Sequence, residues 1–195
     1  KTQARHKDKP GTLTYSVGGS AFNIAVNLGH HGINCSLITV LKKDSFISDW
    51  VRNRLVHNNV KPLVVDSTIE HGESGFIAFR KNGELQSAVS SMKVLESETY
   101  NAELVDRAIA DASLVVVDCN LSDNWLSKII KHARQQGKPI FVEAVSEPKS
   151  KRIMDLTNVS GICIEMFFLN ELEAHFLFNK KFKDVLEQLK QQPES

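Results

Sequence analysis

Two adjacent glycines stand directly before a stretch with the pattern of a helix, and an asparagine lies about one turn into it. Gly18 and Gly19 open the stretch, and Gly32 ends it. Glycines let backbone N–H groups approach a ligand with no Cβ in the way, and the first N–H groups of a helix have no partner within it. The amide of Asn23 can both donate and accept hydrogen bonds, which suits neighbouring hydroxyl groups. The spacing predicts that Gly18, Gly19 and Asn23 bind ligand hydroxyls; the alternative is a turn and helix start that bind nothing.

Polar residues also stand at the ends of two apolar runs. Asp118 ends the run 114–118 with Asn120 two residues later, and Glu143 ends the run 139–143. Ligands of open α/β sheets bind at the carboxyl ends of the strands, so these side chains are candidates for a binding site. The alternative for Asn120 is to cap the helix that begins after it.

Asn170 and Glu173 form a further pair in a helical pattern. A spacing of three residues places both side chains on one face of a helix. An amide and a carboxylate suit a hydrated Mg²⁺, which keeps several of its waters when bound. From the spacing alone, a capped helix with solvated carboxylates explains the pair better than a metal site.

The elements that must position these residues alternate between strands and helices. Apolar runs typical of parallel strands covered on both faces lie at 35–41, 114–118, 139–143 and 161–165. Helical patterns lie at about 19–31, 45–58, 99–112, 122–136 and 147–157. A final amphipathic helix is predicted near 180–192, with Phe182, Val185, Leu186 and Leu189 facing inward. The alternation predicts a doubly wound α/β fold with a mostly parallel, Rossmann-like sheet.

One segment breaks this alternation. Residues 74–80 and 85–90 read as two strands joined by a turn at Asn82 and Gly83, which predicts a β-hairpin. Residues 15–17 are expected to add a strand beside it. We interpret this small antiparallel sheet as a lid; the alternative is an edge hairpin of the main sheet.

Composition narrows the classes of function. The 195 residues are 42% hydrophobic and carry a formal net charge of +1, so charge gives no sign of a nucleic-acid partner or a membrane surface. No apolar run reaches the roughly 18 residues of a membrane span, and no signal peptide is recognised. Cys35, Cys119 and Cys163 lie in apolar runs without metal-binding spacing. We expect buried, reduced thiols and a cytoplasmic protein.

The stretch 18–32 follows the pattern Gly-Gly-x-x-x-Asn-x-Ala-x-x-Leu-x-x-x-Gly. This pattern resembles the N-terminal signature of the ribokinase (PfkB) carbohydrate kinases, and the chain is most similar to their pseudouridine kinase-like branch. The resemblance implies one ribokinase-like α/β domain over 1–195, incomplete, with a β lid from about 11–17 and 73–92. It also implies ATP and Mg²⁺ as cofactors, phosphorylation of a hydroxymethyl group of a sugar or nucleoside, and a homodimer formed through the lid.

Carried over residue by residue, the resemblance assigns two groups of ligands. Asn170 and Glu173 match the family's Asn-x-x-Glu motif on the metal side. The substrate-binding positions are Gly18, Gly19, Asn23, Ser91, Asn120 and Glu143.

Several positions depart from the family's pattern. Ser91 stands where related kinases often have an Asp, Lys42 replaces a Gly two residues before Asp44, and Glu143-Ala144 replaces an Asp-Pro or Asn-Pro. The basic residues that follow, Lys149, Lys151 and Arg152, are interpreted as a solvated helix face.

The family's catalytic Asp, in a C-terminal Gly-Ala-Gly-Asp turn, has no counterpart in the sequence, and neither has the Asp of its first strand. The base is therefore expected outside this sequence. The alternative is a fragment, or a non-catalytic relative that keeps a sugar or nucleoside pocket. A nucleotide-binding oxidoreductase is disfavoured because no Gly-x-Gly-x-x-Gly follows a first strand.

Overall fold

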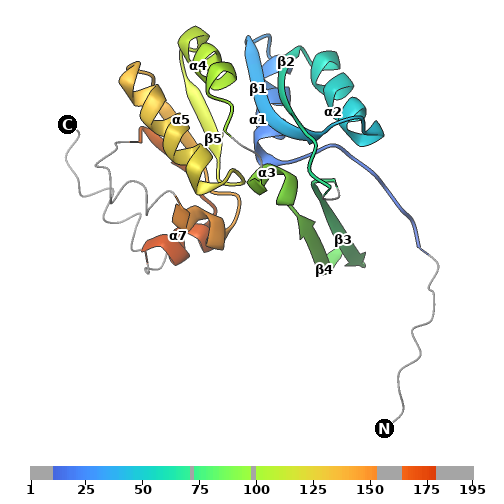
Figure 1. The fold of residues 1–195 in the computed structure, drawn as a ribbon. Coiled ribbons are helices and arrows are strands. Elements are labelled where there is room, and N and C mark those ends of the chain that lie inside the picture. Colours follow the sequence, from blue (N-terminus) through green and yellow to red (C-terminus); the bar gives the residue numbers. More distant parts are fainter. Residues whose placement is uncertain (1–10, 71–72, 98–99, 153–163, 179–195) are drawn as a thin grey trace.

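The computed structural model describes residues 11–70, 73–97, 100–152 and 164–178 (Figure 1). The first half contains α1 (Ser20–His30), β1 (Cys35–Lys42), α2 (Phe46–His57), β2 (Val60–Ser67), β3 (Gly75–Lys81), β4 (Glu84–Ser91) and α3 (Lys93–Ser97). The second half contains α4 (Ala102–Asp111), β5 (Val115–Asp118), α5 (Asp123–Gln135), β6 (Ile140–Glu143), β7 (Met166–Phe168) and α7 (Glu171–Phe178). A further helix begins at Glu147 and is described to Arg152.

The strands confirm the predicted α/β class. β1 pairs with β2, β5 with β6, and β6 with β7, all in parallel, whereas β3 and β4 are antiparallel. The parallel strands form two ladders, and no hydrogen-bonded pairing joins β1 to β5 within the described residues. Helix α1 contacts β1, β2 and β5 and so connects the two ladders.

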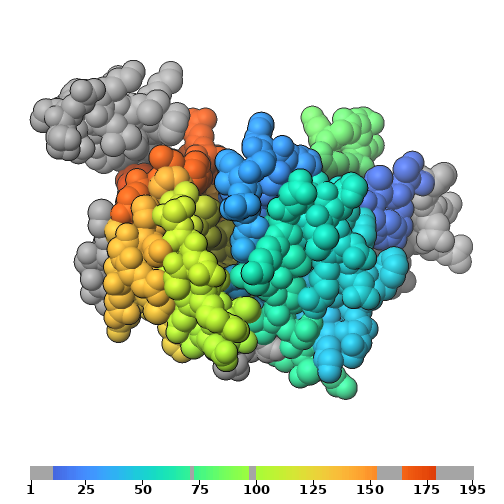
Figure 2. Space-filling model, turned by 90° about the horizontal axis from the view of Figure 1, so that it is seen from above, coloured from blue at the N-terminus to red at the C-terminus, as the bar shows by residue number. Residues whose placement is uncertain are grey.

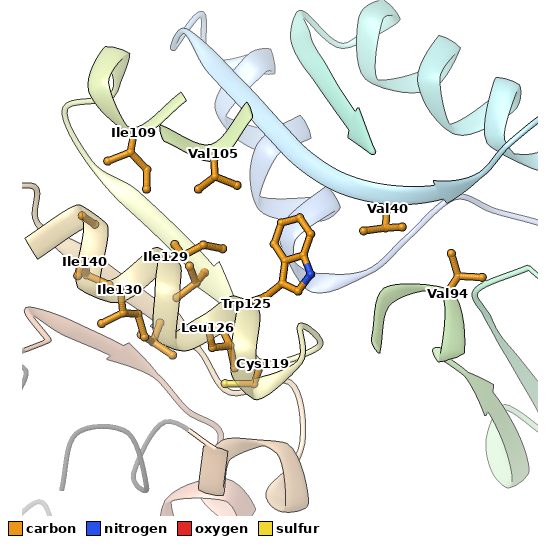
Figure 3. Packing of buried hydrophobic residues seen from close by; sticks show 13 residues of the cluster. Val40, Val94, Val105, Ile109, Cys119, Trp125, Leu126, Ile129, Ile130 and Ile140 are labelled. Atoms are coloured by element: carbon orange, nitrogen blue, oxygen red, sulfur yellow. The ribbon is translucent and has the colours of Figure 1, made fainter. Parts of the chain in front are cut away.

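Side chains of β1 alternate between two hydrophobic cores, as expected of a strand covered on both faces. Leu37 packs against the cluster around Phe22 of α1. Val40 belongs to the other cluster, which includes the fully buried Trp125 of α5. Figure 3 shows Val40 between Trp125 and Val94 of α3. These cores fix the strand ends, where the candidate site lies.

The helices cover the sheet in the order that the alternation predicts. Seen from above, α4 and α5 lie side by side at one flank, and α2 with β2 lies at the other (Figure 2). Within the described part, no helix has both the length and the apolar character needed to cross a membrane.

The glycine stop of α1 is confirmed. Gly32 has φ 72°, its N–H donates to the Gly29 carbonyl at 3.1 Å, and the Ile33 N–H donates to the Leu28 carbonyl at 3.0 Å. This is a Schellman cap, which favours glycine at the left-handed position. Gly29 is also required by packing, because a Cβ there would lie 2.0 Å from the backbone oxygen of Asn58.

The hairpin is confirmed, but the extra lid strand is not. Asn82 has φ 53° and Gly83 has φ 84°, the left-handed pair that a two-residue hairpin turn needs. Residues 11–19 contain no strand, so the expected strand at 15–17 is wrong and the hairpin consists of β3 and β4 alone. Figure 1 places this hairpin beyond α3, at the end of the molecule where α1 and α5 begin.

Two strands differ from the prediction. The strand β2 was not predicted. The strand expected at 161–165 is wrong at Ile164 and Glu165, which precede the observed strand β7 that begins at Met166. Cys119 is fully buried as expected, whereas Cys35 is only half-buried. Cys163 and the predicted helix near 180–192 lie outside the described residues.

Candidate functional site

The start of α1 meets the carboxyl ends of β5 and β6. The Ala21 N–H donates to Oδ2 of Asp118 at 3.3 Å. The side chain of Ser20 lies close to the carboxyl group of Glu143 and lowers its pKa as a hydrogen-bond donor. Carboxylates are favourable at a helix N-terminus, where the helix dipole is positive and N–H groups lack partners. The two strand ends and the helix start therefore form one polar cluster.

The two glycines serve this cluster in different ways. Gly19 is the N-cap of α1 with φ 111°, a backbone conformation that side chains with a Cβ rarely adopt. Gly18 is exposed, and no atom lies within 4 Å of the place that a Cβ would take. Asn23 is exposed on α1, and its N–H donates to the Gly19 carbonyl at 2.9 Å. The backbone requires glycine at position 19 and leaves Gly18 and Asn23 accessible.

Asp118 and Asn120 hold each other in place after β5. Oδ1 of Asp118 accepts from the Asn120 N–H at 3.0 Å, and Oδ2 accepts from Nδ2 of Asn120 at 3.1 Å. Asn120 is 8% exposed, and its Oδ1 accepts a hydrogen bond from Nζ of Lys149 at 2.6 Å. Asp118, which is not among the substrate-binding positions that the resemblance assigns, therefore links Asn120 to the start of α1.

The interpretation of the basic residues after Glu143 as a solvated face is wrong for two of the three. Lys149 contacts Asn120, and Arg152 donates to the backbone carbonyls of Cys119 and Leu121 at 3.2 and 2.8 Å. Only Lys151 is exposed. Sequence reasoning missed Lys149 because the contact depends on how the chain turns after β6. The sequence feature that could have indicated this contact is a lysine six residues after Glu143, the carboxylate at the end of a strand.

That turn has an unusual backbone. Val145 has φ 69°, and the Ser146 N–H donates to the Ala144 carbonyl at 2.8 Å, which describes a γ-turn. A β-branched residue in the left-handed region is strained. The Val145 N–H also lies close to the carboxyl group of Glu143 and lowers its pKa as a hydrogen-bond donor. The turn thus fixes Glu143 and starts the helix that carries Lys149.

Glu143 lies among other acidic groups. Burial raises its pKa above the ordinary value of 4.5, hydrogen bonds from Ser20 and the Val145 backbone oppose the rise, and the charges of Glu173 and Asp118 add to it. In this cluster Glu143 therefore stays neutral up to a higher pH than an isolated glutamate would.

The thiol of Cys119 lies in the same region. Burial, followed by the charge of Asp118, raises the pKa of this thiol to about 12, so it is not a nucleophile.

Asn170 and Glu173 form a reciprocal cap at the start of α7. The Glu173 N–H donates to Oδ1 of Asn170, and the Asn170 N–H donates to Oε2 of Glu173, both at 2.9 Å. This is the geometry of a capping box. Glu173 is only 4% exposed, so it is not the solvated carboxylate of the capping alternative. No group of three or more His, Cys, Asp or Glu side chains in the described part is placed to hold a metal. The metal role of the pair stays a prediction.

Two pockets open at the carboxyl ends of strands. One, of about 270 Å³, lies where the hairpin ends and is lined by Ser90, Ser91, Met92, Lys93, Glu96 and Lys149. The other, of about 580 Å³, lies at the ends of β1 and β2 and includes Lys42 and Asp44. The structure thus places Ser91 beside Lys149, one side chain away from Asn120.

Parallel strands covered by helices, with a polar cluster at their carboxyl ends and a hairpin beside it, define a doubly wound α/β protein, a class whose ligands bind at that edge of the sheet. The family model of the pfkB family carbohydrate kinases matches residues 2–195. The chain belongs to this family.

Two relatives and one solved structure illustrate the relationship. The pseudouridine kinase of Escherichia coli (strain K12) is 29% identical over 177 residues, which cover 86% of this chain and 52% of that protein. The guanosine-inosine kinase of Exiguobacterium acetylicum is 28% identical over 142 residues, covering 70% of this chain and 46% of that protein. A carbohydrate kinase from Agrobacterium tumefaciens matches with a TM-score of 0.77 and 21% identity, covering 95% of this chain and 60% of that one. The structural likeness concerns the fold, and the chain spans about half the length of these curated relatives.

Proposed function

We propose that the protein containing this chain transfers the γ-phosphoryl group of ATP to a hydroxymethyl group of a sugar or nucleoside. The observation that carries the proposal is the meeting of the α1 N-terminus with Asp118 and Glu143, beside the lid. Catalysis of phosphoryl transfer is mostly positioning and electrostatic stabilisation. A rigid cluster of donors and acceptors at a sheet edge suits the positioning part of this task.

The acceptor is held, in this proposal, by Gly18, Gly19, Asn23 and Asn120, with Glu143 and Ser91 at its borders. Ribose-like hydroxyls can donate to the carboxyl groups of Asp118 and Glu143 and accept from the Asn23 amide. The catalytic base is expected in a part of the protein beyond this sequence.

Glu173, oriented by Asn170, is proposed to serve the Mg²⁺ of the nucleotide. A buried carboxylate whose Oε2 is held by a backbone N–H is a rigid oxygen donor, and Mg²⁺ takes a few such oxygens and keeps several waters. The residues fit a metal bound through one carboxylate and water. The ion would neutralise charge on the phosphate oxygens.

A nucleoside is the favoured class of acceptor. The relatives are named for pseudouridine, guanosine and inosine, and all three are nucleosides. The pocket at the end of the lid, next to the polar cluster, gives space for a group beyond the sugar.

We also propose that the protein is cytoplasmic, in keeping with the free thiols of Cys35 and Cys119.

Substitution of Asn23 tests the acceptor site in the complete protein. The Asn23→Ala variant should raise the KM for a nucleoside acceptor by about two- to tenfold, since one hydrogen bond contributes about 0.5–1.5 kcal/mol, and should leave the KM for ATP unchanged. Asn27→Ala, an exposed asparagine one turn further along α1, is the matched control. An unchanged acceptor KM would contradict this site. Thermal stabilisation by nucleosides without ATP turnover would instead favour the non-catalytic binding protein.

A further inference from the structure

Lys149 makes a contact beside the proposed sugar site that this site does not explain. This side chain is half-buried, unlike the exposed Lys151 on the same helix, and its ammonium donates to Oδ1 of Asn120 at 2.6 Å. An ammonium group has three donors, and the bond to Asn120 uses one of them. Two N–H groups therefore remain available beside the pocket that Lys149 also lines.

Lys149 stands at the end of a continuous row of hydrogen bonds. The row begins at the Ala21 N–H of α1, passes through Asp118 and Asn120, and ends at the Lys149 ammonium. The first part of the row is the proposed site for sugar hydroxyls. The last part borders the pocket at the end of the lid. A ligand whose sugar lies at the start of α1 can therefore extend a second group along the row into this pocket.

The walls of the pocket indicate the chemistry of that second group. Ser90, Ser91 and Lys149 offer hydrogen-bond donors, and Met92 offers an apolar surface for a flat ring. The acidic wall residue, Glu96, is paired with Arg152 at 3.3 Å. A volume of about 270 Å³ is slightly below the usual range for whole ligands, so the pocket suits a part of one. A planar heterocycle that accepts hydrogen bonds through a carbonyl oxygen matches these walls.

We propose that Lys149 determines acceptor specificity by donating a hydrogen bond to a carbonyl oxygen on the heterocyclic base of the nucleoside. The inference rests on the proposed function, since it places the base relative to the proposed sugar site. It deepens that function from sugars and nucleosides in general to nucleosides with an oxo-substituted base. A ligand lacking the carbonyl would leave the ammonium without this partner, which costs binding free energy.

The test compares Lys149→Met with Lys151→Met in the complete protein. Pseudouridine and inosine carry ring carbonyl groups, whereas adenosine and ribose do not. Isothermal titration of each probe, with and without a non-hydrolysable ATP analogue, measures binding apart from turnover. Lys149→Met should weaken binding of the better oxo nucleoside by at least about tenfold, as expected for a hydrogen bond to a charged group, and change ribose binding by less than about twofold. Lys151→Met should change neither.

Equal weakening for all probes would overturn the inference, because Lys149 would then act only by orienting Asn120. Absence of nucleoside binding by the unmodified protein would overturn it as well. If Lys149→Met does not fold, Lys149→Gln, whose amide can still donate to Asn120 but is shorter and carries no charge, should show a smaller loss that is selective for the oxo nucleosides. Nucleoside binding without phosphoryl transfer would contradict the proposed kinase activity while leaving the role of Lys149 supported by selective binding.

Discussion

At the scale of single residues, carboxylates from two strand ends lie against the start of α1. Asp118 accepts from the Ala21 N–H, and Glu143 lies beside the side chain of Ser20. The glycine pattern predicted N–H groups open to a ligand, and the structure gives one of the first of them, that of Ala21, an acceptor from a neighbouring strand end. Hydroxyls that bind here would therefore donate to carboxylates as well as accept from N–H groups.

Glu143→Gln should make the protein more stable than the unmodified chain at neutral pH. The pKa of Glu143 is raised in the fold, mainly by burial. The stability associated with its neutral form is therefore present below the ordinary pKa and is lost as pH rises through the raised value. Glutamine stays neutral and keeps an oxygen for the bonds from Ser20 and Val145. Thermal unfolding from pH 4 to pH 8 should show an advantage of the glutamine variant that grows with pH.

The matched control is Glu171→Gln, an exposed glutamate in the first turn of α7. Its effect on the melting temperature should be small across the same pH range. If Glu143→Gln instead lowers stability at neutral pH, the ionised carboxylate is favoured in the cluster, and the physical account of Glu143 is wrong.

Residue types could predict some of these contacts and not others. The spacing of Asn170 and Glu173 placed both on one face, and the structure confirms that they meet. A capping box and a metal ligand pair need the same spacing, so the sequence alone could not separate them. Lys149 could not be placed, because its position follows from a left-handed valine at 145 that no propensity favours.

At the scale of elements, proline explains the strand that was not predicted. β2 contains Pro62, which lacks an N–H and lowers the expectation of a strand. Within the described sheet β2 pairs only with β1, and proline is tolerated on such edge strands. β7 has only three residues, and an apolar run this short does not show from the sequence where the strand begins. Long periodic helices such as α5 were located to within one or two residues.

Ala144→Pro, which introduces the proline of the family's pattern, should destabilise this chain. Ala144 is 1% exposed, and its N–H donates to the Phe168 carbonyl at 3.2 Å, extending the pairing of β6 with β7. Proline removes this donor and with it a hydrogen bond that extends the sheet, which costs about 0.5–1.5 kcal/mol. Denaturant unfolding should detect the loss.

Ala102→Pro is the control for the chemistry of proline itself. Ala102 is exposed at the first position of α4, after the N-cap Asn101, where an N–H has no partner within the helix. This variant should change stability by less than about 0.5 kcal/mol. Equal effects of the two prolines would show that the Ala144 hydrogen bond contributes nothing specific.

At the scale of the whole molecule, the fold class was predictable, and the grouping of the strands was not. Alternating apolar runs and helical patterns indicate parallel strands covered on both faces, which the two cores confirm. Which strands pair is decided by tertiary packing, here by α1 contacting both ladders. The polar cluster follows from the topology, because parallel strands bring their carboxyl ends to one edge.

The hairpin presents an apolar surface that we propose as the contact of a homodimer. Ile77 pairs with Val89, and Phe79 with Ser87, so Ile77, Phe79 and Val89 share one face of the hairpin. Ile77, Phe79 and Val89 are each 55–58% exposed. Exposed apolar sheet surfaces of this kind favour association with a partner.

Val89→Lys should weaken this association in the complete protein. A lysine at the centre of an apolar contact must lose water without gaining a partner, so dimerisation should weaken by about tenfold or more. Sedimentation equilibrium over a range of concentrations measures the change. Ser90→Lys is the matched control, because Ser90 lies on the opposite face of the same strand, across from Phe76. If Ser90→Lys disrupts the dimer and Val89→Lys does not, the other face of the lid carries the contact. If the unmodified protein stays monomeric at every concentration, the apolar face does not join two copies of the chain.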